Sequence, residues 1–229
     1  ELSNLMKLPL GSIVTCIAQA QSSQQHGSLK MRDSFPYHAS GVTGSTMWFS
    51  IWKTSFAPQI LITDSNLNLI TTLDIIASRG KIYNMVSAGG FMWACSDDGI
   101  FVFNSLTFEL VKSITTPVTP FSITCLAKIA SPLAASSSEE ASSSSQNLSS
   151  SSSHILSSGE HKQNHLIWAF SRDHILHVYD PVTFNCLQST ALTASDSETA
   201  FVLQAVPVAK DRILTLASDG SISAWTYLK

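Results

Sequence analysis

Short apolar segments separated by polar turns recur along this chain, in the same order each time. One apolar run leads into a polar turn, in most copies rich in Ser, Asp and Gly, and a second run of alternating polarity follows. Such pairs of runs occupy residues 47–64, 91–103, 166–179 and 212–225. Alternation of apolar and polar residues over about four to eight positions is typical of strands with one buried face. Each segment therefore predicts a β-hairpin.

Two of these hairpins carry a strong turn signal. Asp98-Gly99 and Asp219-Gly220 stand between their two apolar runs. Glycine accepts the positive φ that a tight hairpin turn demands, so these dipeptides favour short connections. The copy at 47–64 has a longer turn that contains a proline.

The spacing of the hairpins indicates one repeating unit. Trp48 and Trp93 are 45 positions apart, and Trp168 and Leu214 are 46 positions apart. Trp93 and Trp168 are 75 positions apart, but a long polar insertion lies between them. A period of about 40–45 residues is typical of the four-stranded blades of a β-propeller.

Two further strands complete each predicted unit. Short apolar inner strands precede the hairpins at 13–18, 82–87, 123–127 and 201–206. More polar outer strands follow at 67–73, 109–114 and 185–191, as expected for sheet edges. The chain thus holds four units, the last without an outer strand. Residues 2–8 resemble an outer strand, which would pair with the last unit or with a unit outside these residues.

Composition and charge narrow the classes of partner. The formal net charge is −3, and the 13 Lys and Arg residues form no basic run. Proteins that bind nucleic acid neutralise phosphates with clustered Lys and Arg, so no nucleic-acid partner is expected. No apolar run approaches the roughly 20 residues that a membrane span requires, so no membrane span is expected either.

The cysteines favour a reducing compartment. Cys16, Cys95, Cys125 and Cys186 lie far apart, each within an apolar, strand-like run. Their even number permits two disulfides, but buried free thiols in a cytosolic protein explain them better. We therefore expect a cytoplasmic location.

Two polar stretches interrupt the repeat. Residues 19–46 contain Gln, Ser, Gly and His and predict a long loop. Twelve of the eighteen residues at 136–153 are Ser, and such a tract buries too little apolar area to order itself, so 131–164 is expected to be disordered. Ser136 and Ser137 each precede a Glu by three positions and are candidates for phosphorylation by an acidophilic kinase. A low-complexity linker without a role is the favoured explanation of the tract.

The chain carries no motif of a familiar catalytic or cofactor site. Nucleophile elbow, zinc-protease, P-loop and dinucleotide-binding patterns do not occur. His174 and His177 are three positions apart and would point to opposite faces of a strand, so surface histidines are favoured over a zinc site. We expect no cofactor, no metal and no catalytic activity.

Charged residues in the hairpin turns are the candidates for binding a partner. The acidic residues occupy equivalent turns and could form a rim that receives a basic peptide. The candidates in these turns are Asp97, Asp98, Asp173 and Asp219, together with Arg172. Bonding of each carboxylate to its own backbone, which stabilises the turn, is the favoured explanation of these acidic residues.

The tryptophans divide into two groups. Trp48, Trp93 and Trp168 recur at one place in the repeat, which predicts packing between blades. Trp52 breaks this pattern, and exposed tryptophan is enriched at protein interfaces. We take Trp52 as a further candidate for partner binding.

With these features in place, the chain resembles the WD40 or WD40-like repeat family. Tyr179-Asp180, Phe103-Asn104 and Ala224-Trp225 stand where that family has its Trp-Asp ending, and Ser218-Asp219-Gly220 matches its turn. No unit carries the family's Gly-His dipeptide or an intact Trp-Asp, so its buried hydrogen-bond network is not carried over. The resemblance implies an all-β, WD40-like β-propeller over residues 1–229. Degenerate blades of this kind are similar to propeller regions of large signalling proteins such as Rho-family exchange factors.

The resemblance implies a non-catalytic scaffold for protein–protein interaction, with a protein or peptide partner, within a larger cytoplasmic signalling or regulatory protein. We favour four blades of a larger propeller over a complete four-bladed ring, since propellers typically have about 4–8 blades. The alternatives are an accessory domain of a Rho-type exchange factor and, from another class, a propeller enzyme or lectin. A propeller enzyme or lectin would need charged groups on the inner strands, but these strands carry mostly Ile, Val, Thr, Cys and Ala.

Overall fold

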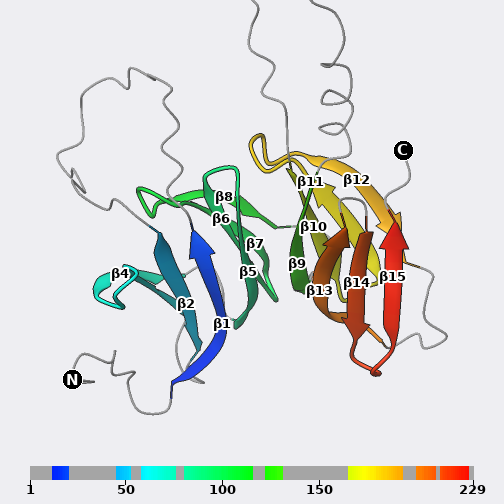
Figure 1. The fold of residues 1–229 in the computed structure, drawn as a ribbon, viewed down its shortest axis with the longest axis horizontal. Coiled ribbons are helices and arrows are strands. Elements are labelled where there is room, and N and C mark those ends of the chain that lie inside the picture. Colours follow the sequence, from blue (N-terminus) through cyan, green and yellow to red (C-terminus); the bar gives the residue numbers. More distant parts are fainter. Residues whose placement is uncertain are drawn as a thin grey trace, which may run out of the picture.

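The computed structural model describes residues 12–20, 45–52, 58–75, 80–115, 122–130, 165–192, 200–209 and 212–226. Within them, fifteen strands form four antiparallel sheets that follow one another along the chain (Figure 1). The predicted loop 19–46 and insertion 131–164 lie mainly outside the described residues, as do Ser136 and Ser137. Gln19, Ala20 and Thr46 are described, and they belong to strands.

Each sheet is one blade, built by consecutive strands. The first blade holds β1 (Ile13–Ala20), β2 (Thr46–Trp52), β3 (Gln59–Thr63) and β4 (Leu69–Asp74). The second holds β5 (Ile82–Ala88), β6 (Phe91–Ser96), β7 (Gly99–Asn104) and β8 (Leu110–Ile114). The third holds β9 (Ile123–Ala130), β10 (His165–Ser171), β11 (Ile175–Tyr179) and β12 (Cys186–Ala191). The fourth holds β13 (Val202–Ala209), β14 (Arg212–Ala217) and β15 (Ile222–Thr226).

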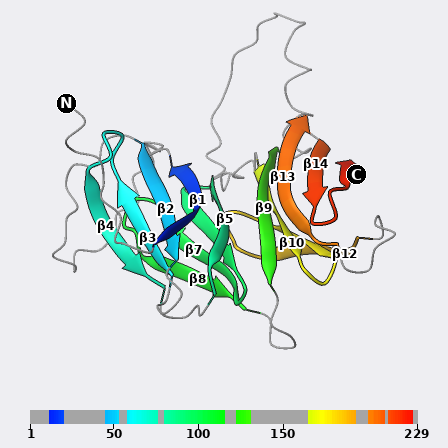
Figure 2. The ribbon, with the colours of Figure 1, turned by 90° about the horizontal axis from the view of Figure 1, so that it is seen from below.

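The blades are arranged as an open arc. The inner strands lie side by side in the order β1, β5, β9 and β13. The first and fourth blades stand at opposite ends of the array in both views (Figure 1, Figure 2), and β1 does not pair with β13. The predictions of an all-β fold, a four-unit repeat and an incomplete ring are confirmed in the described residues.

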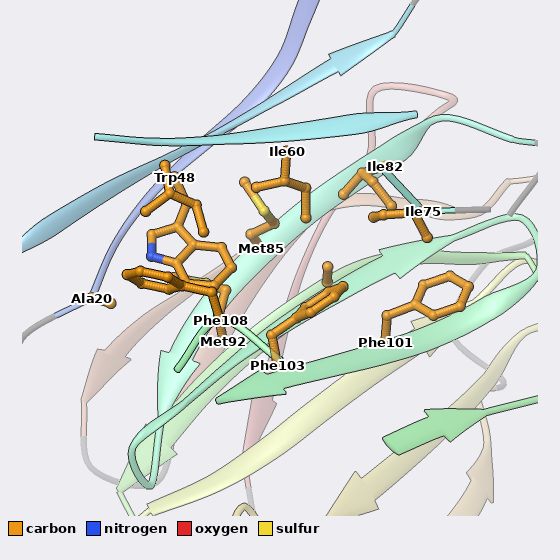
Figure 3. Packing of buried hydrophobic residues seen from close by; sticks show 12 residues of the cluster. Ala20, Trp48, Ile60, Ile75, Ile82, Met85, Met92, Phe101, Phe103 and Phe108 are labelled. Atoms are coloured by element: carbon orange, nitrogen blue, oxygen red, sulfur yellow. The ribbon is translucent and has the colours of Figure 1, made fainter. Parts of the chain in front are cut away.

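Apolar side chains on facing sheets hold neighbouring blades together. Between the first and second blades, Trp48 and Ile60 meet Met85, Phe101 and Phe103 in one buried cluster (Figure 3). Trp93 occupies the same position between the second and third blades, and Trp168 between the third and fourth. All three tryptophans are buried, so their prediction as inter-blade core residues is confirmed.

The turn after the third strand of a blade also contributes to the contact between neighbouring blades. An Asp or Asn side chain caps the turn in the first three blades: Asp64 accepts from the backbone of Asn66, Asn104 from Leu106, and Asp180 from Val182. The second and third blades then place an aromatic residue at positive φ, Phe108 (φ 63°) and Phe184 (φ 60°). Phe108 lies 5.8 Å from Trp48 and Phe184 lies 5.8 Å from Trp93, measured between ring centroids. Each of these turns therefore reaches back to the tryptophan of the preceding blade.

Two details differ from the sequence-based picture. Ile213 pairs with Trp225 as Met92 pairs with Phe103, so Trp225-Thr226, rather than Ala224-Trp225, is the counterpart of Phe103-Asn104. Cys186 is exposed on an outer strand, where few neighbours cover it. All four cysteines are free; burial, the main cause, raises the pKa of the Cys16 and Cys125 thiols to about 12.

Candidate functional site

The turns between second and third strands lie on one face of the arc. Residues 97–98 join β6 to β7, residues 172–174 join β10 to β11, and residues 218–221 join β14 to β15. Because blades repeat in the same orientation, these turns and the residues that lead into the inner strands share one face of a propeller. We call the surface formed by these turns, with Gly80, Ser122 and Phe201, the turn face.

Local bonds fix the backbone of each turn. Ser96 Oγ accepts a hydrogen bond from the backbone N of Asp98 at 3.1 Å, and Asp219 Oδ1 accepts one from Ser221 N at 2.9 Å. Hydrogen bonding by Ser221 holds the pKa of Asp219 below its ordinary value. The third blade has His174 at φ 61° where the second and fourth blades have Gly99 and Gly220. His174 is thus a turn residue and lies outside β11, contrary to its sequence assignment to a strand.

Asp97 connects the second blade to the third. Its Oδ1 accepts hydrogen bonds from the Tyr83 hydroxyl at 2.6 Å and from Ser122 Oγ at 2.8 Å. Ser122 directly precedes β9, the inner strand of the third blade. Burial, reinforced by the bond to the Asp97 carboxylate and its charge, raises the pKa of Tyr83. A Cβ at Gly80 would stand 2.5 Å from Asp97 Oδ2, so this turn leaves no space for a larger residue there.

Arg172 connects the third blade to the fourth. Its backbone N donates to Ser122 O at 2.9 Å, and its guanidinium lies 4.8 Å from the centre of the Phe201 ring. Phe201 in turn exchanges two bonds with Ser218, donating to its Oγ at 3.2 Å and accepting from its backbone N at 2.9 Å. A continuous set of contacts therefore runs across three blades.

A small hollow lies between the third and fourth blades, lined on one side by Ser171 and His174. Its space of about 30 Å³ is enough for one water molecule. Phe201, Val202, Leu192 and Trp225 supply apolar walls, and several Ser and Thr side chains supply polar ones. Ser223 leaves space for the hollow, because it stands opposite Thr215 at the place where the second blade has the bulky Phe101 opposite Ala94.

The structure brings most of the predicted binding residues onto the turn face. Asp97 and Asp98 are half-buried, whereas Arg172, Asp173 and Asp219 are exposed. Trp52 is half-buried at the end of β2, opposite Ile13, and residues 53–57 after it lie outside the described part. Asp97 accepts hydrogen bonds from Tyr83 on β5 and from Ser122, the residue before β9.

Sequence reasoning missed Tyr83, Ser122 and Phe201. Each stands at or near the start of an inner strand, a segment whose sequence is mainly apolar. Their shared place relative to the inner strands was visible in the repeat, but their contacts with the next turn were not. Among the described residues, no three His, Cys, Asp or Glu side chains gather as a metal site, and no helix there is long and apolar enough to span a membrane.

Comparison with known proteins identifies the fold. No protein-family model and no curated protein sequence matches this chain. Among solved structures, 80% of the chain aligns with 47% of the WD40 β-propeller domain of Doa1, at 13% identity and a TM-score of 0.50. It also aligns over 80% of its length with 40% of Chaetomium thermophilum Sqt1, solved bound to the N-terminus of ribosomal protein L10, at 16% identity and a TM-score of 0.54. Chaetomium thermophilum Raptor matches at 13% identity and a TM-score of 0.50, over 80% of this chain and 15% of that one.

These likenesses establish a partial WD40-like β-propeller. The chain spans less than half the length of the solved structures named here. The expected resemblance to WD40 repeats is confirmed at the level of the fold. None of the three is a Rho-family exchange factor.

Proposed function

We propose that this partial WD40-like propeller is a non-catalytic scaffold that binds a protein or peptide on its turn face. The observation that carries the proposal is the set of contacts from Asp97 through Ser122 and Arg172 to Phe201. It fixes turns from three blades against one another while leaving Arg172, Asp173 and Asp219 exposed to a partner.

Rigidity of this surface favours binding. A partner that meets preorganised side chains loses less conformational entropy on association than one that must order loops. Arginine is also enriched at interface hot spots, and Arg172 is held over an aromatic ring in a defined orientation. The exposed charges are of both signs, so they suit a peptide that carries an acidic group close to a basic one.

One of the solved propellers supports a peptide as the kind of partner. The Sqt1 structure holds the N-terminus of a ribosomal protein. A shallow surface with a hollow of about 30 Å³ accommodates an extended segment more readily than a whole small molecule, which needs a pocket of roughly 300 Å³ or more.

The test compares capture of proteins by the full chain and by two arginine variants. Arg172→Ala removes a cation from the turn face. Arg212→Ala removes a cation from the start of β14, which is the end of that strand far from the turn face. We expect partners recovered specifically by the wild-type protein to fall several-fold with Arg172→Ala and to be retained with Arg212→Ala. Equal recovery by all three forms would place binding elsewhere and contradict the proposal.

The acidic residues of the turn face and Trp52 would make separate contributions to binding. Asp97, Asp98, Asp173 and Asp219 would contact basic groups of the partner, and Trp52 would supply an apolar contact beside them. Asp219→Lys and Trp52→Ala in the same assay separate these two contributions. A charge reversal without effect on recovery would remove Asp219 from the surface.

The wider context stays a prediction. A cytoplasmic signalling or regulatory protein, including a Rho-type exchange factor, would carry this propeller beside a catalytic or helical domain in the same polypeptide. Phosphorylation of Ser136 and Ser137 would add negative charge in the Ser-rich tract. Intact-mass analysis of the purified protein with and without phosphatase, followed by peptide mapping, tests the modification.

A further inference from the structure

Two exposed cations on the turn-face side of the arc each lie over an aromatic ring. Lys81 stands directly before β5, and its Nζ is 5.2 Å from the centre of the Tyr83 ring. The Arg172 guanidinium is 4.8 Å from the centre of the Phe201 ring. Attraction between a cation and the face of a ring restricts the orientation of a long side chain. Both cations are therefore oriented before a partner binds.

Both cations act on one side chain, Tyr83. Burial raises the pKa of Tyr83, and the positive charge of Arg172 opposes this shift. Hydrogen bonds join the same groups, because Arg172 N donates to Ser122 O at 2.9 Å. Ser122 Oγ and the Tyr83 hydroxyl both donate to Asp97 Oδ1. Lys81 and Arg172 therefore belong to one connected set of side chains.

The carboxylate in this set is already bonded within the protein. Asp97 Oδ1 accepts two hydrogen bonds, at 2.6 Å from Tyr83 and at 2.8 Å from Ser122. Lys81 and Arg172, by contrast, form no ion pair with a carboxylate in the part of the chain that the structure describes. An acidic group from a partner would therefore meet two cations whose charge no described carboxylate has taken up by direct contact.

These cations lie in the interior of the arc. Lys81 belongs to the second blade and Arg172 to the third, and each of these blades has a neighbouring blade on both sides (Figure 1). The ring under Arg172 comes from the start of the fourth blade. The exposure of the two cations therefore arises from the turns themselves.

The aspartates of the turn face limit the negative charge that this surface accepts. Asp97, Asp98, Asp173 and Asp219 all stand in its turns. A carboxylate ligand brings a single negative charge, whereas a phosphate group brings about 1.5–2 at neutral pH. Repulsion from the four aspartates therefore favours a carboxylate over a phosphate.

We propose that a carboxylate side chain of the partner peptide, from Asp or Glu, binds at Lys81 and Arg172. A guanidinium presents N–H groups that match the two oxygens of a carboxylate, and an ammonium adds a compact positive charge. The inference rests on the proposed function, because it names the group that the turn face recognises in its peptide. It also adds Lys81 to the residues that contact the partner.

The probe is a display library of random peptides, selected on the purified full chain. We expect the enriched peptides to share Asp or Glu at one position. The affinity of one such peptide is then measured by fluorescence anisotropy, beside the same peptide with Asn or Gln at that position. Loss of the charge should weaken binding to the wild-type chain roughly tenfold, because hydrogen bonds to charged groups are the stronger ones.

A double-mutant cycle identifies the residues that bind this group. A chain with both Lys81→Ala and Arg172→Ala should bind the acidic peptide as weakly as the neutral one and no longer distinguish them. Lys112→Ala removes an exposed cation from the outer strand β8 and is the matched control, which should retain the full difference. Both Lys81 and Arg172 are exposed, so an unchanged circular dichroism spectrum is expected for all variants.

Three results would overturn the inference, and they separate it from the proposed function. Enriched peptides that share a basic residue and no acidic one, and that bind less well after Asp173→Asn or Asp219→Asn, would leave the peptide site standing without this carboxylate. A phosphoserine peptide that binds more tightly than the Glu peptide through the same two cations would make phosphate the ligand. A selection that enriches no peptide, or only peptides that no turn-face variant affects, would count against the proposed function as well.

Discussion

Single residues in this protein show that polar side chains fix the turns and join the blades. Asp64, Asn104 and Asp180 cap equivalent turns, while Asp97 instead bonds to the Tyr83 hydroxyl and to Ser122. The repeat in the sequence locates such residues, because their positions recur. It does not reveal the direction of a carboxylate, which depends on the neighbouring blade.

His177 on β11 gives the fold a dependence on pH. The side chain is buried, its Nδ1 lies 2.8 Å from Ser189 Oγ, and burial lowers its pKa from the ordinary 6.5 although Asp173 opposes the shift. As pH falls through 6.5, the unfolded chain takes up a proton that folded His177 accepts only at lower pH. Stability is therefore expected to fall between pH 6.5 and the lowered pKa, and to level off below it.

The matching variant is His177→Leu. It should make the free energy of unfolding less dependent on pH, measured by urea denaturation at about pH 7.5 and about pH 5.5. His165, whose pKa burial also lowers, should leave a residual slope, which His165→Gln would reduce. An unchanged slope in His177→Leu would show that this histidine is protonated normally in the folded protein.

At the scale of strands and turns, the sequence predicted most of the architecture. Inner strands, hairpins and outer strands lie within a few residues of their expected positions, because alternation and Asp-Gly turns are local signals. The exact ends of strands were predicted less well. The counterpart of the Trp-Asp ending in the fourth blade was placed one position early, at Ala224-Trp225, and His174 was assigned to a strand although it adopts a positive φ in a turn. Both depend on pairing with strands distant in the sequence.

The two Asp-Gly hairpins offer a matched comparison of backbone strain and steric conflict. Gly220 has φ 84° with open space around it, whereas at Gly99 (φ 129°) an added Cβ would collide with the Ile114 carbonyl oxygen. Gly220→Ala should lower the free energy of unfolding by about 1–2 kcal/mol through strain alone. Gly99→Ala should lower it more. Equal losses in urea denaturation would mean that the collision is relieved by a shift of β8.

At the scale of the whole molecule, the blades form one arc through repeated aromatic contacts. The tryptophan of one blade meets the third-strand aromatic and the turn aromatic of the next, as Trp48 meets Phe103 and Phe108. The period of the repeat predicted blades, and the tryptophans predicted their mutual packing. The turn aromatics were missed, because nothing in the sequence marks a phenylalanine that adopts positive φ.

Phe108 should therefore stabilise the junction of two blades. Phe108→Ala removes a buried ring from the cluster around Trp48 and should lower the free energy of unfolding by about 3 kcal/mol. Leu106→Ala, two residues away at a position 53% exposed, is the control and should change it by less than about 0.5 kcal/mol. A Phe108→Ala protein as stable as the Leu106→Ala protein would show that the blades hold together without this ring.

The most direct test of the central claim is to map a bound partner by hydrogen–deuterium exchange. The complex isolated by capture on the wild-type chain is compared with the free chain, amide by amide. The account predicts slower exchange at residues 97–98, 172–174 and 218–221, in three neighbouring turns, and little change at 64–68, 104–109 and 180–185 on the opposite face. Slower exchange confined to those opposite turns, with none on the turn face, would contradict it.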